Sequence, residues 1–264
     1  MDKIWVIMRK EWSEVFKNRF VLFTVAFLPL ILVALPLIML YFTGSSGGDL
    51  SGLSGTDMPT RFAELCGGMT ESECGQYFLV SQFMLLFMLM PLAIPVTIAS
   101  YSIVGEKTTH TLEPVLATPV TTLELLAGKA LAAAVPGVTV TWIGFVIFEV
   151  GAHLIATSPV VLARLTEPLW LLAIFLIGPL LAIASVSVAV MVSSRAHDPR
   201  VAEQLSMLVI LPLLAVFFGQ IAGLFLINEK LIMWMAVALV IIDAGLFAFA
   251  IQLFQRETIL TRWK

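Results

Sequence analysis

The stretch GEKTTHTLEPVLATPVTTLELLAGK, Gly105 to Lys129, is a polar passage between two strongly apolar blocks. The blocks are residues 78–100 and 123–150, and each is long enough to cross a hydrocarbon core of roughly 30 Å at about 1.5 Å per helical residue. Pro114 and Pro119 interrupt the passage, because proline lacks a backbone donor and disfavours helix at the residue before it. We therefore expect a bent surface element held at a membrane face between two spans.

The composition places the whole chain in a membrane. Of its 264 residues, 59% are hydrophobic and only 12% are charged, whereas a soluble domain carries about 25% charged residues. The net charge of −3 indicates no particular partner. Nucleic acid is not expected as a partner, because the basic residues neither cluster with aromatics nor form a stripe. We expect no cleavable signal peptide, since no small-residue cleavage site separates the basic start from the first span.

Hydropathy predicts an all-α membrane protein with a single transmembrane domain over residues 1–264. Its six predicted transmembrane helices cover residues 20–42, 78–101, 123–150, 169–192, 204–227 and 231–254. Pro29 and Pro36 should bend the first helix, and Pro91 and Pro95 should kink the second.

Two local patterns predict details of these helices. Thr122 is placed to act as the N-cap of the third helix, with Glu124 in the first turn where a carboxylate complements the helix dipole. Gly219 and Gly223 form a Gly-x-x-x-Gly pattern in the fifth helix, which predicts close packing against another helix. A gate or a break in the helix is the alternative.

Residues 1–19 precede the first span, and residues 3–19 are predicted to form an amphipathic helix. Its apolar side holds Ile4, Trp5, Met8, Trp12, Val15 and Phe16, and its polar side holds Lys3, Lys10, Ser13, Glu14 and Lys17. A basic amphipathic helix with two tryptophans is suited to the lipid headgroup layer, with its cations near anionic lipid. The alternative is a simple leader into the first span.

The basic residues predict the orientation. Six spans place both termini on one side, and the segments on that side hold twelve basic residues: Lys3, Arg9, Lys10, Lys17, Arg19, Lys107, Lys129, Arg195, Arg200, Arg256, Arg262 and Lys264. The other side holds three, namely Arg61, Arg164 and Lys230. Because basic residues concentrate in cytosolic segments, both termini and the Gly105–Lys129 passage should be cytoplasmic. Residues 43–77 should then form an extracellular loop.

The passage resembles the cytosolic signature of the ABC-2 family of ATP-binding-cassette transporter permeases. That signature runs from an acidic-basic pair through Gly-Thr-Leu-Glu and Thr/Ser-Pro-Val to a Gly-Lys pair. The matching residues are Glu106, Lys107, Thr111, Leu112, Glu113, Leu116, Thr118, Pro119, Val120, Glu124, Leu125, Leu126, Gly128 and Lys129. His110 stands where the family usually has glycine, and Pro114 follows the Leu-Glu pair. The order of spans fits the family over nearly the whole chain.

The resemblance implies a cytosolic coupling helix over residues 105–119, between the second and third spans, that docks on an ATPase subunit. The implied contact residues are Glu106, Lys107, Thr111, Leu112, Glu113 and Leu116. Glu113 is expected to make the main polar contact, with Glu106 and Lys107 nearer the rim. In this family the N-terminal helix also lies at the cytosolic interface and touches the ATPase.

No catalytic motif is present in the chain itself. The sequences around Gly105 and around Gly128 lack the glycine spacing of a phosphate-binding loop, and neither His110 nor His153 begins a His-Glu-x-x-His pattern. We expect no enzyme activity, no cofactor and no metal site in this chain, with ATP bound by a partner subunit.

Cys66 and Cys74 fall in one polar loop. In an oxidising compartment they are close enough in sequence to form a disulfide across a short, flexible turn. Two free thiols are the alternative.

One carboxylate, Asp243, lies about halfway along the last span, where a charge is costly and normally faces protein or water. It is a candidate ion or substrate contact on a translocation path together with Gln220 and Gln82. The alternative is a buried carboxyl bonded to Gln220, Ser185 or Ser187.

The resemblance therefore implies the permease subunit of an exporter in the plasma membrane. Such a subunit forms a translocation path with a second permease copy or paralogue and is driven by cytosolic ATPase subunits; members export lipids, glycan carriers, drugs or sodium. The alternative is a membrane scaffold or mechanotransmitting subunit that uses the ATPase without moving a solute. A secondary transporter would be expected to show several intramembrane charges or broken helices with matching halves, and only Asp243 is available.

Overall fold

The chain folds as a bundle of long helices. The computed structural model describes residues 2–17, 19–45, 59, 62, 66–108, 121–156, 158–196 and 198–253. Within these ranges there is no strand, and six helices are long and apolar enough to cross a membrane: Val21–Gly44, Ser72–Glu106, Leu123–Ile155, Pro159–Arg195, Pro199–Ile221 and Glu229–Ala250. The predicted all-α fold with six spans is confirmed.

Several spans consist of more than one helical segment. The elements are α1 Asp2–Val15, α2 Arg19–Ser45, α4 Glu71–Phe87, α5 Met90–Thr108, α7 Thr122–Ile155, α8 Pro159–Leu165, α9 Pro168–Leu172, the π-helix η2 Ala173–Ile177, α10 Gly178–Arg195, α11 Pro199–Ser206, the 3₁₀-helix η3 Met207–Ile210, α12 Leu211–Ile221 and α13 Glu229–Leu253. Pro159, Pro168 and Pro199 each begin a helix, where the missing backbone donor costs nothing.

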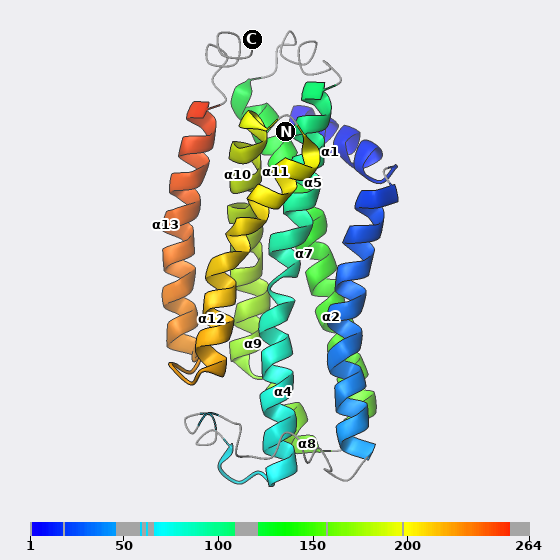
Figure 1. The fold of residues 1–264 in the computed structure, drawn as a ribbon, viewed down its shortest axis with the longest axis vertical. Helices are drawn as coiled ribbons and strands as arrows, with labels where there is room; N and C mark the ends of the chain where they lie inside the picture. Colours follow the sequence, from blue (N-terminus) through cyan, green and yellow to red (C-terminus); the bar gives the residue numbers. More distant parts are fainter. Residues whose placement is uncertain are drawn as a thin grey trace.

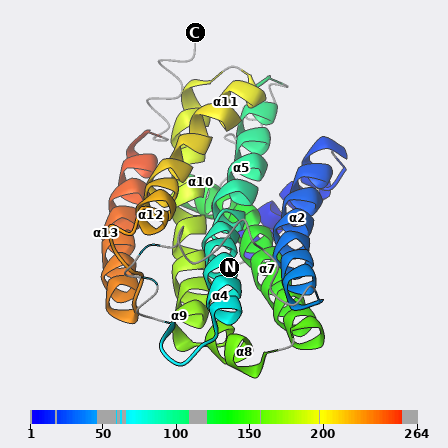
Figure 2. The ribbon, with the colours of Figure 1, turned by 60° about the horizontal axis from the view of Figure 1, so that its bottom comes forward.

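Helices α4 and α5, which together form the second span, occupy the middle of the bundle (Figures 1 and 2). Helices α7 and α10 pack against α5, while α2 and α13 lie on opposite flanks. Helix α1 lies across one end of the bundle, which we call the α1 end (Figure 1). The other end, where α4 begins and α8 lies, is called the disulfide end for the bond described below.

The second span is broken, as its prolines predict. Helix α4 stops before Met88 and Leu89, whose amides bond carbonyls three residues earlier at 3.0 and 2.9 Å. Pro91, the second residue of α5, has no backbone N–H and cannot donate a helical hydrogen bond across the break. Pro95 lies inside α5 against Gly137 of α7, where an added Cβ would come within 2.6 Å of the proline ring. The central span therefore bends and packs closely on α7.

The start of α7 corrects one prediction by a single residue. The N-cap is Thr121, not Thr122. Thr121 Oγ1 accepts a hydrogen bond from the Glu124 amide at 3.2 Å, and the Glu124 carboxylate accepts one from the Thr121 amide at 2.8 Å. This capping box fixes where the third span begins.

The end of α12 corrects another prediction. Helix α12 stops at Ile221, Gly223 adopts φ +68°, and the Leu224 amide bonds the Gly219 carbonyl at 3.0 Å. This is the Schellman pattern, which favours glycine because the residue after the cap is left-handed. A Cβ at Gly219 would lie 2.7 Å from Phe225, in the turn that follows the helix. The two glycines therefore end this helix, which agrees with the alternative of a break. The predicted packing against another helix is not found in the described part of the chain.

Candidate functional site: a buried charge cluster at the α1 end

Helix α1 faces the bundle with a stripe that contains a carboxylate. Met8, Glu11 and Val15 are buried at helical spacing, on the side of α1 that packs on α7. Trp5 and Phe16, predicted on the same apolar side, remain 56% and 45% exposed. The predicted apolar side therefore divides into one part that packs on α7 and another that stays on the surface.

Two contacts hold α1 close to α7. Gly128 provides the space, because a Cβ at this position would lie 2.8 Å from the Cγ2 of Ile7. The Trp12 indole Nε1 donates a hydrogen bond to the carbonyl of Ala132 at 2.9 Å. The glycine of the Gly-Lys pair thus lets α1 approach the first turns of α7.

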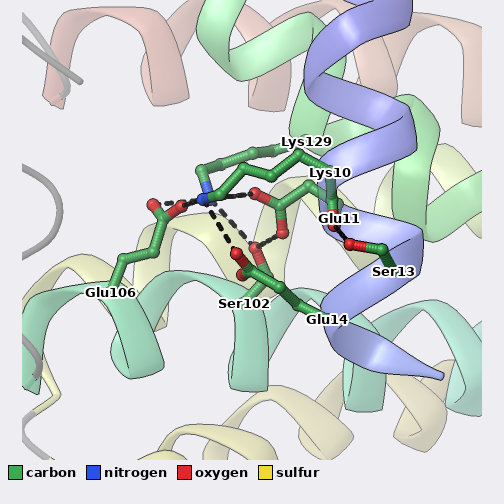
Figure 3. A network of polar contacts seen from close by, with 7 residues as sticks. All are labelled: Lys10, Glu11, Ser13, Glu14, Ser102, Glu106 and Lys129. Atoms are coloured by element: carbon green, nitrogen blue, oxygen red, sulfur yellow. Dashed lines mark hydrogen bonds and ion pairs between the residues drawn. The ribbon is translucent and has the colours of Figure 1, made fainter. Parts of the chain in front are cut away.

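The lysine of the same pair lies between two buried carboxylates (Figure 3). Lys129 Nζ is 2.8 Å from Glu11 Oε1 and 2.7 Å from Glu106 Oε2, and it donates to Ser102 Oγ at 3.0 Å. Ser102 in turn donates to Glu11. The Glu11, Lys129 and Glu106 side chains are 2%, 4% and 5% exposed. Three helices, α1, α5 and α7, therefore meet at one ammonium group.

Lys10 completes the cluster at its exposed edge. Its ammonium group pairs with Glu106 and lies 3.8 Å from Glu11 and 3.5 Å from Glu14, and its side chain is 39% exposed. Burial lowers the pKa of Lys10, but the carboxylates of Glu106, Glu11 and Glu14 outweigh it, so the pKa is raised and the group stays charged at neutral pH. We call Lys10, Glu11, Ser102, Glu106 and Lys129 the charge cluster. Its two lysines balance its two carboxylates, as buried charges require.

The charge cluster links the two ends of the Gly105–Lys129 passage. Glu106 lies near the end of α5 and Lys129 in the second turn of α7, so their ion pair joins the two ends of the intervening segment. Glu106 was expected near the rim of a docking surface; here it is buried inside the chain. Lys107 belongs to α5. The other predicted contact residues, Thr111, Leu112, Glu113 and Leu116, lie outside the described residues.

The predicted translocation residues are buried in the bundle but are not brought together by hydrogen bonds. In the described part of the chain, neither carboxylate oxygen of Asp243 has a hydrogen-bond partner, and the same holds for both side-chain polar atoms of Gln82 and for Gln220 Oε1. The hydrogen bond from Asp243 to Gln220, Ser185 or Ser187 is therefore not formed. Ser185 instead donates to the carbonyl of Ala182 at 2.9 Å.

The disulfide end is fastened by other chemistry. Cys66 and Cys74 are joined by a disulfide, with their Cα atoms 5.4 Å apart. Thr70 and Glu73 form a capping box at the start of α4, and Ser158 donates to Glu73 at 2.6 Å. Across the described ranges, no group of three or more His, Cys, Asp or Glu side chains is placed to hold a metal ion.

Comparison with known families decides what kind of protein carries this cluster. The family described as ABC-2 family transporter protein matches residues 5–236, which extend from α1 into α13 and include every residue of the charge cluster. The chain belongs to the ABC-2 transporter family. This ABC-2 protein is therefore a multi-pass membrane component of an ABC-type transporter, and its family implies association with ATP-binding-cassette ATPase subunits. A search of curated proteins found no match.

Sequence reasoning missed Glu11 and Ser102, and it gave Lys129 no role beyond the motif. A signal for Glu11 was present: at 100° per residue it projects between Ile4 and Ile7, at the edge of the apolar side. A carboxylate at that position is stable only if a cation from another element meets it. The signal for Lys129 is its position inside an otherwise apolar span.

Proposed function

We propose that this ABC-2 chain is the permease subunit of an exporter in the plasma membrane. It forms the translocation path with a second permease copy or paralogue, and separate cytosolic ATP-binding-cassette ATPase subunits drive it. Family membership supports the transporter role. The observation that carries the coupling role is the buried 2.7 Å ion pair between Glu106 and Lys129.

The energy for transport must come from outside this chain. The sequence contains no phosphate-binding loop, so ATP energy must reach the bundle through a contact surface. Residues 109–120 connect α5 to α7, and the Glu106–Lys129 pair holds the two ends of this connection together. A push on the connection therefore moves both helices at once. Thr111, Leu112, Glu113 and Leu116 form the proposed contact with the ATPase, and Glu106 and Lys107 anchor it.

The proposed orientation places the α1 end in the cytosol with both termini. Two features support it: the excess of basic residues on that side of the sequence, and the Cys66–Cys74 disulfide at the other end, since disulfides persist in oxidising compartments. Labelling of the variant Thr109→Cys in sealed, right-side-out cells tests it. No reaction with a membrane-impermeant thiol reagent is expected, and reaction from outside would overturn the orientation.

Asp243, Gln82 and Gln220 are proposed to line the translocation path. Each keeps a buried polar atom with no partner in the described part of the chain. Such an atom inside a span costs free energy unless water, a ligand or another subunit supplies the missing contact. A polar group in transit would supply it. Loss of ATP-driven flux in the variant Asp243→Asn, with assembly retained, is the expected result.

Co-purification of the chain with its co-expressed ATPase tests the coupling surface. Glu113→Lys should weaken the complex about 30-fold or more, because a partly buried carboxylate that loses its partner costs at least about 2 kcal/mol. Leu112→Ala with Leu116→Ala should weaken it as well. The matched control is Glu229→Lys, the same charge reversal at the start of α13 and at the disulfide end. A complex that survives both coupling variants contradicts the proposal. ATP-driven flux in vesicles then separates a transporter from a scaffold.

A further inference from the structure

We infer that α1 is a third transmitting element, and that Glu11 is a positioning residue that fixes α1 through Lys129 to both ends of the 109–120 connection. Helices α1, α5 and α7 then move as one rigid unit when the ATPase turns over. This inference rests on the proposed function and adds to it the residue, Glu11, and the buried ion pair by which the N-terminal helix is fixed to the coupling helices.

The geometry of the charge cluster carries the inference (Figure 3). Lys129 on α7 contacts Glu11 on α1 at 2.8 Å and Glu106 on α5 at 2.7 Å. Ser102, one turn before Glu106 on α5, donates to Glu11 and so joins α1 to α5 directly. Moving any one of the three helices away would leave a buried charge without its partner, which the apolar surroundings oppose strongly.

The packing around the charge cluster allows little independent motion of α1. Gly128 lets the Ile7 side chain lie directly on the α7 backbone, and the Trp12 indole is bonded to the Ala132 carbonyl. Close packing of this kind transmits displacement, because cores are not continuously deformable. The α1–α7 contact is therefore a rigid joint.

A second ion pair between the same two helices gives a built-in comparison. Lys3 on α1 and Glu124 on α7 lie 3.5 Å apart, with side chains 51% and 29% exposed. Water and salt screen such a pair, and it contributes little. If closeness of opposite charges were enough to transmit motion from α7 to α1, both ion pairs would contribute equally. We expect that only the buried Glu11–Lys129 pair transmits this motion.

The experiment uses the full chain with its ATPase, reconstituted in vesicles of phosphatidylethanolamine and phosphatidylglycerol. Spin labels are attached at Leu154→Cys and Leu224→Cys, two positions at the disulfide end that are 82% and 69% exposed. The native cysteines do not compete, because they are bonded to each other. The readouts are the amount of bound ATPase, its hydrolysis rate, and the change in label-to-label distance on trapping with ATP and vanadate.

The variant Glu11→Gln keeps the size of the side chain and removes its charge. It should retain the ATPase and its hydrolysis, while the fraction of molecules that change distance on trapping falls about tenfold, the scale of a typical coupling between sites. Lys3→Gln should respond like the parent. A purely structural role for Glu11 would lower thermal stability and leave the trapped distance change intact.

A cross-link provides the rescue. A Cβ at Gly128 would lie 3.0 Å from the Ile7 Cβ, slightly closer than the roughly 3.5–4.5 Å between the Cβ atoms of a disulfide. A shift of α1 by about 0.5 Å therefore lets Ile7→Cys and Gly128→Cys form the bond. In the Glu11→Gln background, oxidation should restore the trapped distance change, and reduction should abolish it again. The parent chain under the same reductant controls for loss of the Cys66–Cys74 bond.

The outcomes separate this inference from the proposed function. A normal distance change in Glu11→Gln, a cross-link that restores nothing, or loss of the ATPase from Glu11→Gln would each overturn the role of α1. The proposed function fails on a different result, namely an ATPase that stays bound both in Glu113→Lys and in the double variant Leu112→Ala with Leu116→Ala. The inference is supported if Glu11→Gln keeps ATP hydrolysis but loses the distance change on trapping, and if oxidation of the added cysteine pair restores that distance change.

Discussion

The two ends of this bundle are fastened by different chemistry. At the α1 end, the ammonium group of Lys129 pairs with carboxylates of two other helices, and Lys129 and Glu11 are 118 residues apart in sequence. At the disulfide end, Cys66 and Cys74 are eight residues apart and joined covalently. The disulfide fixes the entry to one helix. The ion pairs fix three helices relative to one another.

This difference indicates that the α1 end, and not the disulfide end, must keep a fixed arrangement of helices for the chain to function. Buried ion pairs add little net stability, because desolvation offsets their attraction, but they penalise every arrangement that separates the partners. They therefore suit a joint that must keep one geometry under load. A disulfide over a short loop chiefly restricts the unfolded chain.

Lys129→Met should be the most damaging substitution. It leaves the carboxylates of Glu11 and Glu106 buried beside each other with one fewer cation, and breaking a buried ion pair on one side costs about 3–5 kcal/mol. The free energy of unfolding, measured by tryptophan fluorescence in detergent with rising denaturant, should fall by that amount.

A control for Lys129→Met also neutralises the two carboxylates, Glu11 and Glu106, that this substitution leaves unpaired. Adding Glu11→Gln and Glu106→Gln to the same chain should recover at least half of the lost stability, because the unpaired carboxylates are gone. If the triple variant is as unstable as Lys129→Met alone, the loss comes from packing and not from charge.

Removing the disulfide should have the next largest effect on stability. Changing Cys66 and Cys74 together to serine should lower the free energy of unfolding by about 2–3 kcal/mol, the loop-entropy cost for so short a closed loop. The bonds at the α1 end should be unaffected, so the ATP-dependent distance change of the labelled chain should persist. Loss of that change would show that the two ends are not independent.

The fold could be predicted from the sequence because membrane thickness sets the length of an apolar span. The break before Pro91 was equally predictable, since proline cannot continue a helix without loss of a hydrogen bond. The boundary at Thr121 was missed by one residue because Thr121 and Thr122 are equivalent caps by composition. Gly219 and Gly223 were misinterpreted because their spacing also fits a Schellman ending, and local sequence does not distinguish the two.

The charge cluster could be predicted only in part. The family signature includes Glu106 and Lys129, but it does not say that they touch each other. Glu11 lies outside the signature, and its partner is 118 residues away. Pairing over such a distance depends on how α1 lies across the bundle. The pattern of α1 alone indicates a misplaced carboxylate, and only the tertiary structure supplies its cation.

Gly128→Val should have a smaller effect that is confined to the α1 end. An added Cβ would meet Ile7 at 2.8 Å, so the larger side chain should overpack the joint and lower the free energy of unfolding by about 1–2 kcal/mol. Combining Gly128→Val with Ile7→Ala returns volume to the contact and should recover most of the loss. No recovery would mean that Ile7 is not the side chain that valine displaces.

The smallest effect is expected at the exposed pair, and it provides the sharpest test of the contrast between buried and exposed charges. Lys3 and Glu124 join the same two helices as Glu11 and Lys129, but water reaches both side chains. A double-mutant cycle of Lys3→Gln and Glu124→Gln should give a coupling energy below about 0.5 kcal/mol that vanishes at high salt. Glutamine retains the capping box with Thr121, so the start of α7 is not disturbed. The matching cycle of Glu11→Gln and Lys129→Met should give at least about 1.5 kcal/mol and little dependence on salt, because the charges are shielded from ions. Equal coupling energies in the two cycles would mean that burial does not distinguish these pairs, and the charge cluster would then be no stronger a joint than any surface contact.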